Sequence, residues 1–285
     1  AERVGFVWSC NPRGDKMRLS AVAAAAGMII GSTSLALAQQ NEGVSGAPGV
    51  NPKDNISKFE VLYKYDDFNM GAGSHSLTLK YDKAITKEIG FNVETPFVYY
   101  QGFGLEDAGL GDVQVRVRYV KSFGQISPIA GLELVTPTAT AETLGRGKWQ
   151  LNPTVGAVYA FSPTVFAFVG YKHILSFAGD SDRTDINESQ PRLLLAYTSP
   201  KGWWTLGDLK FTKSWECSPN SLVTDPGDLE RSVPSLRCMK PQALDLEFEL
   251  GTMIAPTTGV WVRSGTSFLD STREYGINVG LRQIF

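Results

Sequence analysis

Hydrophobic and polar residues alternate in twelve segments of the chain, spread from residue 57 to the last residue. Residues 113–119 read VQVRVRY and residues 244–250 read LDLEFEL, so that every second side chain is hydrophobic. A period of two residues predicts β-strands that are hydrophobic on one face and polar on the other. Each segment is close to the roughly 9–11 residues that a tilted strand needs to cross a bilayer. The last segment, residues 274–285, keeps the pattern and ends on Phe285.

The connectors between these segments alternate in length. Those after the even-numbered segments are short, whereas most of those after the odd-numbered segments are longer and more polar, such as residues 102–112 and 178–189. Outer-membrane barrels have the same asymmetry, with tight periplasmic turns and long outer loops. We therefore predict an all-β fold, a transmembrane antiparallel up-and-down β-barrel of about twelve strands over residues 57–285. A soluble β-sandwich, the alternative, gives no reason for its loops to alternate in this way.

The polar face of the predicted strands carries many charges. A lumen that holds water or ion pairs accommodates such a face, while Val, Leu, Phe and Tyr face the lipid. These inward residues are the candidates for lining the lumen and for selecting solutes. They are Glu60, Lys64, Glu94, Arg116, Arg118, Glu133, Arg192, Lys210, Asp245, Glu247, Glu249, Arg263 and Arg282.

Strand order places several of these charges beside one another. Arg116 lies on the strand between those that carry Glu94 and Glu133, and Arg282 faces Glu60 where the last strand closes on the first. One interpretation is a structural lattice of ion pairs that stiffens a narrow barrel. The other is a selectivity ladder, with basic and acidic walls on opposite sides of a pore. The sequence leaves both open.

Composition narrows the range of functions. Lys and Arg number 27 against 29 Asp and Glu, so the chain has no basic excess and no nucleic-acid partner is expected. The mean hydropathy of -0.11 argues against helical membrane spans. It does not argue against a barrel, whose strands face lipid only at every second residue.

The first 56 residues have a different character. Residues 17–38 combine a positive start, a short apolar core and an A-x-A site, which predicts a cleaved signal peptide rather than a transmembrane anchor. Residues 1–16 are interpreted as an upstream extension that is not part of the native protein. Residues 39–56 are rich in Gly, Pro, Asn and Ser and predict a flexible periplasmic lead-in. Export and a barrel together predict the bacterial outer membrane as the location.

Two cysteines remain after the predicted cleavage, Cys217 and Cys238, on either side of one long outer loop. In an oxidising compartment they are expected to form a disulfide, with two free thiols as the alternative. The expected partners are outer-membrane lipid, a small-molecule solute and the barrel-assembly machinery. That machinery would recognise the terminal strand, with Phe285 as the insertion signal.

Catalytic and cofactor motifs are not evident. Nucleophilic hydrolysis needs a serine activated by a base. The two histidines, His75 and His173, lack the serine two residues further on that outer-membrane phospholipases carry, since Leu77 and Leu175 stand there. A base met across strands is the route left open to an enzyme. The glycine-containing stretches lack nucleotide-loop spacing, and the acidic residues of 180–188 lack EF-hand spacing. No enzyme, cofactor or metal is therefore predicted.

Residues 109–112 (GLGD) feed a strand that ends in residues 118–119, residues 151–153 (LNP) open another strand, and residues 200–204 (PKGWW) precede residues 215–216 (WE). These short segments resemble the MetA-pathway-of-phenol-degradation family of outer-membrane proteins. The resemblance covers most of residues 91–216. It implies a β-barrel transporter of small compounds, with aromatic and other hydrophobic compounds among the candidates.

The predicted function is thus an outer-membrane channel or transporter that passes small solutes passively through a charged lumen. Two alternatives remain. A lipid-modifying hydrolase would bring a serine, a histidine and an amide or acid together on the lipid-facing rim. A structural or binding barrel would have a lumen blocked by its own side chains and would not conduct.

Overall fold

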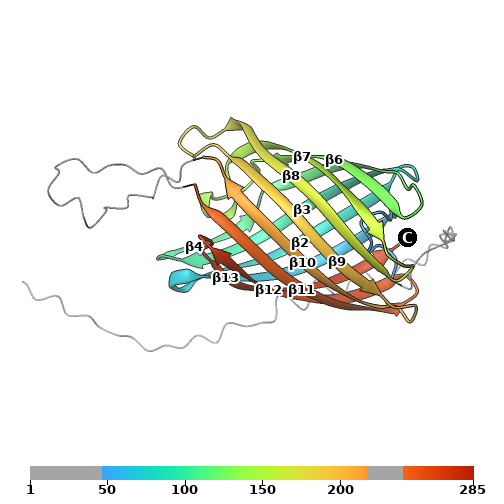
Figure 1. Cartoon of the computed structure of the whole chain (residues 1–285). Coiled ribbons are helices and arrows are strands. Elements are labelled where there is room, and N and C mark those ends of the chain that lie inside the picture. Colours follow the sequence, from blue (N-terminus) through green and yellow to red (C-terminus); the bar gives the residue numbers. More distant parts are fainter. Residues whose placement is uncertain (1–46, 217–239) are drawn as a thin grey trace, which may run out of the picture. The chain divides into compact units, whose positions relative to one another are not determined.

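The computed structural model describes residues 47–216 and 240–285, in which thirteen β-strands form one antiparallel sheet. β1 pairs with β2 on one side and with β13 on the other, and β2 pairs with β3, so the sheet closes into a barrel (Figure 1). The strands are β1 (Lys58–Phe68), β2 (Ala72–Ala84), β3 (Ile89–Gly102), β4 (Leu105–Leu110), β5 (Val113–Val120), β6 (Ile126–Thr136), β7 (Lys148–Ala160), β8 (Val165–Gly179), β9 (Asn187–Thr198), β10 (Trp203–Ser214), β11 (Gln242–Ala255), β12 (Thr258–Leu269) and β13 (Arg273–Ile284). Two single-turn 3₁₀ helices, η2 (Asn69–Gly71) and η3 (Glu142–Leu144), lie in the connections.

The thirteen strands fill twelve positions in the barrel wall. The first half of β3, residues 89–94, pairs with β5, whereas residues 97–102 pair with β4. β4 and β5 therefore form one line beside β3, interrupted at residues 111–112. The prediction of a twelve-stranded antiparallel up-and-down barrel is confirmed, with one wall strand split in two.

One connector was predicted wrongly. The sequence predicts a loop over residues 102–112, but β4 covers Leu105–Leu110 within them. The turn into β4 is only two residues long, Phe103 and Gly104, both with positive φ. The prediction fails because this polar, glycine-rich stretch becomes a strand through its pairing with β3. Such tertiary pairing overrides a weak local preference.

The interruption after β4 lets residues 137–147 fold back against that strand. The backbone N–H of Thr140 donates to the last residue of β4 at 3.0 Å. The Asp112 carboxylate accepts the backbone N–H of Arg146 at 2.6 Å. A Cβ on Gly109 would lie 2.0 Å from the Thr140 hydroxyl, so this approach requires glycine. The GLGD segment thus has a structural role, which is to hold this loop against the wall.

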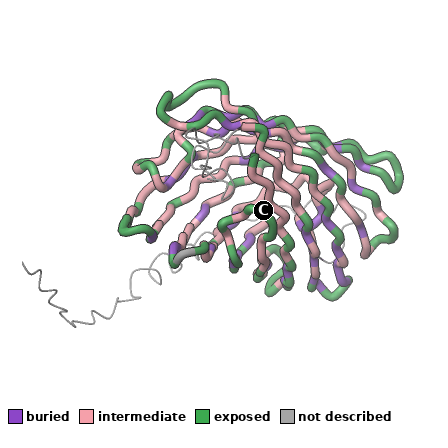
Figure 2. Tube along the Cα trace, turned by 60° about the vertical axis from the view of Figure 1, so that its left-hand side comes forward, coloured by how far each residue is buried: buried purple, intermediate pink, exposed green. Residues whose placement is uncertain are grey.

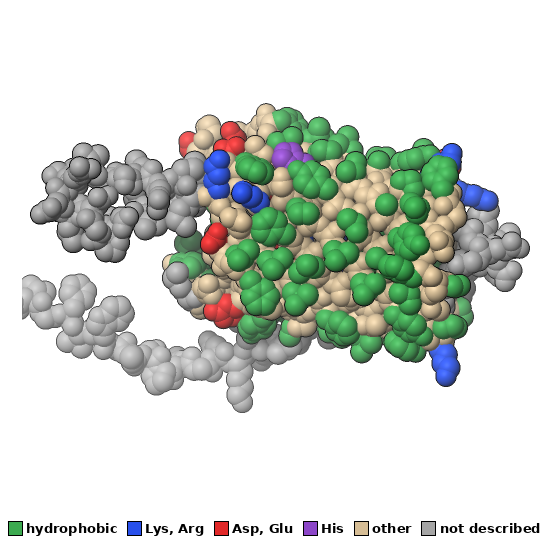
Figure 3. All heavy atoms as spheres, viewed as in Figure 1, with side chains coloured by type: hydrophobic (Ala, Val, Ile, Leu, Met, Phe, Trp, Pro, Cys, Tyr) green, Lys and Arg blue, Asp and Glu red, His purple; other side chains and the backbone are tan. Residues whose placement is uncertain are grey.

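Hydrophobic side chains cover the outside of the barrel. The exposed strand residues are those of the predicted hydrophobic phase, among them Val117, Leu132 and Phe248. Figure 3 shows such side chains over the visible wall, with charged side chains gathered towards the two ends. A barrel surrounded by lipid requires this distribution. No helix within residues 47–216 and 240–285 is long and apolar enough to cross a membrane.

The two ends of the barrel differ. We call the end that holds Ser57 and Phe285 the turn end, and the opposite end the loop end. Exposed residues gather at the turns and loops of both ends (Figure 2). At the loop end, η2 and residues 270–272 make short connections, whereas residues 137–147 and 180–186 make longer ones. The turn end holds residues 85–88, 121–125, 161–164, 199–202 and 256–257.

Candidate functional site: the barrel lumen

The predicted lumen residues share one phase of the strands, opposite to the lipid-facing one. All thirteen are buried or half-buried, although the residues between them are hydrophobic and many are exposed. Glu133 and Glu249 are almost fully buried, at 2% and 3% exposure. Alternation along a strand places these charged side chains inside the barrel.

A chain of ion pairs follows the inner wall from β2 to β8. Lys80 Nζ lies 3.1 Å from a Glu94 oxygen, and Arg116 lies 3.7 Å from the same oxygen. Arg116 Nε also donates to Glu133 at 2.8 Å. On the other side, Lys172 Nζ lies 2.9 Å from the second Glu133 oxygen. The charges therefore alternate in sign along this chain, in which β7 contributes the neutral Asn152.

A second chain follows β9 to β12. Arg192 Nε donates to Asp208 at 2.8 Å, and Arg263 lies 3.5 Å from the same carboxylate. Arg263 also donates through Nε to Glu249 at 2.8 Å and lies 3.5 Å from Glu247. One guanidinium thus serves three carboxylates on two neighbouring strands, which offsets the cost of keeping them charged away from bulk water.

The seam between the last and first strands continues this arrangement. Arg282 Nε on β13 donates to Glu60 on β1 at 2.5 Å, and Lys58 lies 3.2 Å from the same oxygen. We call twelve residues of these three groups together the charge belt. It consists of Glu60, Lys80, Glu94, Arg116, Glu133, Lys172, Arg192, Asp208, Glu247, Glu249, Arg263 and Arg282.

The belt follows the wall and does not cross the lumen. In the described part of the chain, its ion pairs join strands that are adjacent or next but one. Both signs occur along each part of the wall. This mixture corresponds to the lattice interpretation more closely than to basic and acidic walls on opposite sides.

Some predicted residues have partners that the sequence did not suggest. Lys64 pairs with Asp66 two residues further along its own strand, at 2.6 Å. Arg118 donates to a backbone carbonyl oxygen, that of Asp54, at 3.3 Å. Lys210 contacts Asp245 at 2.9 Å, as strand order indicates.

Three members of the belt are absent from the predicted list, and one of them, Lys80, has the inward phase of its predicted strand. The other two were missed. Asp208 has the same phase as Lys210, so its position in the sequence was sufficient to find it. Lys172 lies in a stretch that is hydrophobic on both faces, where the alternation gives no phase. Its inward direction follows only from the pairing of β8 with β7 and β9.

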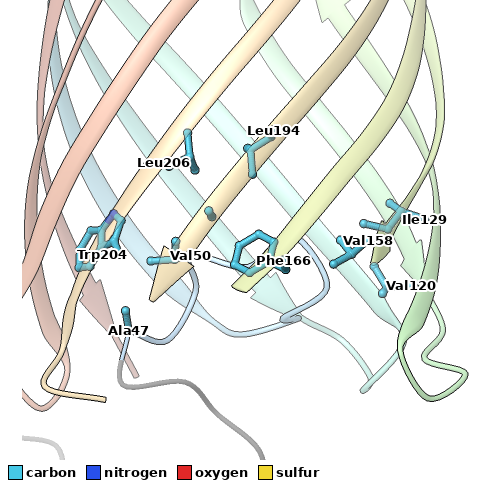
Figure 4. Close-up of a cluster of buried hydrophobic side chains, with 10 residues drawn as sticks. Ala47, Val50, Val120, Ile129, Val158, Phe166, Leu194, Trp204 and Leu206 are labelled. Carbon is cyan, nitrogen blue, oxygen red and sulfur yellow. The ribbon is translucent and has the colours of Figure 1, made fainter. Parts of the chain in front are cut away.

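Residues 47–56, here called the plug segment, occupy the inside of the turn end. Ala47 is fully buried and Val50 is 9% exposed. They belong to a cluster with inward side chains of β5 to β10, including Phe166 and Trp204 (Figure 4). This corrects the expected flexible lead-in: from Ala47 on, the segment is packed within the barrel. The burial of its few apolar side chains stabilises that position.

Polar contacts also hold the plug segment. Arg282 donates to the backbone carbonyl oxygen of Pro48 at 3.4 Å, and the side-chain amide of Asn55 donates to the backbone carbonyl oxygen of Thr86 at 2.7 Å. Burial raises the pKa of the Asp54 carboxyl above its ordinary value of 3.8, against the opposing effect of nearby cations. A cavity of about 390 Å³ remains between this segment and the turns at residues 124–125 and 160–163. The turn end is thus narrowed but retains space.

Trp204 connects the apolar cluster to the charge belt. Its ring is fully buried, and its Nε1 donates to Glu249 at 2.7 Å. The Arg282 guanidinium lies 5.7 Å from the ring centroid, within cation–π distance. A Cβ on Gly251 would come within 2.2 Å of the ring, so glycine there lets the indole lie against the wall.

The lipid-facing surface brings one serine and one histidine together. His173 and Ser189 stand opposite each other on β8 and β9, with Nδ1 and Oγ 3.5 Å apart. The Ser189 hydroxyl also lies 2.8 Å from the Tyr171 hydroxyl and accepts the Trp215 indole N–H at 2.9 Å. The His173–Ser189 distance is at the outer limit for a hydrogen bond. This is part of the arrangement that the hydrolase alternative requires.

The other histidine has an aromatic environment. His75 on β2 lies 2.8 Å from the Tyr63 hydroxyl and packs beside Tyr65 and Tyr99. Aromatic girdles at a membrane interface have this composition. No group of three or more potential metal-ligating His, Cys, Asp or Glu side chains occurs within residues 47–216 and 240–285.

The remaining predicted features have different outcomes. Phe285 is half exposed and stacks on Tyr81, with ring centroids 6.1 Å apart. Its role as an insertion signal stays a prediction. Cys217 and Cys238, the signal peptide at residues 17–38 and the extension at residues 1–16 lie outside the described residues.

No protein-family model matches this chain, and no curated protein matches its sequence. The family resemblance therefore stays a prediction. Among solved structures, an outer-membrane channel from Pseudomonas putida F1 matches with a TM-score of 0.66 and 12% identity, over 81% of this chain and 96% of that chain. The NanC porin and the KdgM porin match with TM-scores of 0.55 and 0.54, each at 12% identity over 80% of this chain and 99% of theirs. At such identities the comparison establishes the fold, which is that of an outer-membrane β-barrel.

Proposed function

We propose that this protein is an outer-membrane channel that passes small solutes passively through its lumen. The observation that carries the proposal is the charge belt. Its side chains line the inside of the barrel and pair along the wall. In this proposal, water and solute pass along the axis that these pairs surround. A polar inner face and an apolar outer face are the arrangement of a membrane pore.

Barrel size is consistent with this function. Eight-stranded barrels are just filled by their own side chains, whereas barrels of 16–18 strands enclose an aqueous channel. Twelve wall positions lie between these limits. A narrow lumen is therefore expected, in which small changes of side-chain length alter the passage of solutes. The three structural relatives named above are channels or porins, which adds support.

The orientation follows from the loops. The turn end would face the periplasm and the loop end the outside, since barrels of this class place their short turns in the periplasm. The plug segment would then stand at the periplasmic mouth. Outer-membrane lipid and the barrel-assembly machinery remain the proposed partners of the outer wall and of the terminal strand. Aromatic and other hydrophobic compounds remain candidate solutes through the family resemblance alone.

Liposome swelling tests the proposal. Liposomes that contain the refolded protein are placed in isotonic L-arabinose, a small neutral sugar, and their swelling is followed by light scattering. Swelling faster than in liposomes with heat-unfolded protein supports passive diffusion. Equal rates for protein of verified β-structure would favour the non-conducting barrel.

The His173–Ser189 contact favours a second candidate function, hydrolysis of outer-leaflet lipid. Ser189 would act as nucleophile and His173 as base. No carboxylate among the described residues hydrogen-bonds to His173, and the Ser189 hydroxyl is shared with Tyr171 and Trp215. Phospholipase assays of the wild type and of Ser189→Ala separate the two functions. Fatty-acid release by the wild type that is lost in Ser189→Ala would establish the hydrolase function. No release from the wild type would exclude the hydrolase and favour the channel function.

A further inference from the structure

The cation of most lumen ion pairs is more exposed than its anion. The Arg192 side chain is 39% exposed and its partner Asp208 is 5% exposed. Arg116 is 35% exposed against 2% for Glu133. The same order holds for Lys172–Glu133, Lys64–Asp66, Lys80–Glu94, Lys210–Asp245 and Arg263–Glu249. Arg273 is an exception outside the seam, at 12% exposure against 17% for Glu247 and 13% for Asp245.

The carboxylates are held against the wall by further donors. Glu133 accepts the Asn152 amide at 2.9 Å, and Glu249 accepts the Trp204 indole N–H at 2.7 Å. Both acids thus have fixed positions at the wall, while long cationic side chains cover them from the lumen side. Each pair is neutral as a whole but turns its positive end towards the barrel axis.

The seam does not share this polarity. Arg282 and Glu60 are equally buried, at 8% and 9% exposure, and Arg273 and Asp66 are both 12% exposed. Asp82, 22% exposed, is the most exposed carboxylate that a described strand contributes to a lumen ion pair. In the loop at residues 180–186, Asp185 is 73% exposed and pairs with the buried Lys148. The exposed charge of the lumen is therefore predominantly positive, although the numbers of acidic and basic groups are similar.

From this radial order we infer that the lumen selects small anions over cations, with Lys172 and Arg192 as specificity-determining residues. The inference rests on the proposed channel function and adds to it the class of solute. A solute near the axis is closer to the guanidinium and ammonium groups than to the carboxylates behind them. Within a narrow, low-dielectric passage this difference in distance gives a net attraction for anions.

Lys172 and Arg192 are suited to a test because their partners keep other cations. Without Lys172, Glu133 still contacts Arg116, and without Arg192, Asp208 still lies 3.5 Å from Arg263. Replacing both by glutamine therefore removes two exposed charges and leaves neither carboxylate without a cation. Lys201→Gln, on the exposed turn at residues 199–202, is the matched control because it removes a cation outside the belt.

The experiment is the reversal potential of single channels under a KCl gradient. The wild type and Lys201→Gln are expected to pass chloride in preference to potassium. In Lys172→Gln/Arg192→Gln the chloride-to-potassium permeability ratio is expected to fall at least about twofold. Lys172→Arg/Arg192→Lys, which keeps both charges, should retain the wild-type ratio.

Each outcome has a distinct meaning. Channels without anion preference in the wild type would overturn the inference while leaving the proposed function intact. An unchanged chloride-to-potassium permeability ratio in Lys172→Gln/Arg192→Gln would show that these two residues do not determine selectivity. The absence of any current from folded protein would contradict the channel itself, and with it the inference.

Discussion

Arg282 on β13 donates its Nε–H to Glu60 on β1 at 2.5 Å, across 222 residues of sequence. The two residues are opposite each other in the register that closes the barrel. Both side chains are nearly buried, and Lys58 contacts the same carboxylate at 3.2 Å. Closure of the barrel therefore combines a backbone ladder with an ion pair that forms only when the last strand meets the first in this register.

Glu60→Gln tests the contribution of the seam. The variant keeps the size of the side chain but removes the charge that Lys58 and Arg282 contact. Loss of one partner from a buried ion pair leaves uncompensated charge, so the free energy of unfolding is expected to fall by about 3 kcal/mol. Urea titration of the refolded barrel in detergent measures this change.

Glu88→Gln is the control for the seam variant. Glu88 pairs with Lys121 at the turn end, and both side chains are nearly half exposed. Exposed pairs of this kind contribute less than about 1 kcal/mol. Equal losses in Glu60→Gln and Glu88→Gln would show that the seam pair has no special role.

Gly251→Ala is expected to displace the Trp204 ring. The added Cβ would lie within 2.2 Å of the indole, and the wall cannot move aside. Overpacking of this kind costs about 2 kcal/mol. Gly207→Ala on β10 is the control, because its Cβ would meet no described atom within 4 Å. Tryptophan fluorescence and urea titration should both change in the first variant and stay close to wild type in the second.

Val50→Asp is expected to release the plug segment from the turn end. An unpaired carboxylate in the apolar cluster with Phe166 and Trp204 is strongly unfavourable. The barrel wall is unaltered, so the unfolding midpoint should change little while single-channel conductance rises. Val50→Ile, which keeps the apolar contact, should conduct like the wild type. Unchanged conductance in Val50→Asp would mean that the segment does not narrow the path.

Asp54 makes the position of the plug segment dependent on pH. Burial raises the pKa of its carboxyl when the segment is docked, whereas the undocked group has its ordinary value near 3.8. Docking thus takes up a proton between these two values. The docked form is favoured at low pH and weakens as the pH rises through the raised value. Conductance should fall on acidification from neutral pH to about 4, and Asp54→Asn should abolish this dependence.

The alternation of hydrophobic and polar residues in the sequence was sufficient to predict much of the fold. It predicted the strands, their lipid-facing phase and the Arg282–Glu60 and Arg116–Glu133 neighbours, because a period of two residues and the strand order determine which side chains share a face. It did not predict β4, whose residues 105–110 become a strand by pairing with β3. Nor did it place Lys172, where both faces of the strand are hydrophobic.

The plug segment and the His173–Ser189 contact could not be predicted from the sequence, because both depend on contacts that form only in the folded barrel. Ala47 and Val50 are two apolar residues in a stretch rich in Gly, Pro and Asn, and only the three-dimensional barrel provides the apolar surface that buries them. His173 and Ser189 lie 16 positions apart in sequence, and their approach depends on the register of β8 with β9. Contacts set by register need the structure.

Single-channel recording in planar bilayers tests most directly whether the lumen conducts. Purified wild-type protein of verified β-structure and its Val50→Asp variant are each added to a bilayer in KCl. Discrete current steps are expected for the wild type, and larger steps for Val50→Asp. The absence of current from both proteins would contradict a conducting lumen. In that case the side chains of the barrel wall would block the passage even after the plug segment is released.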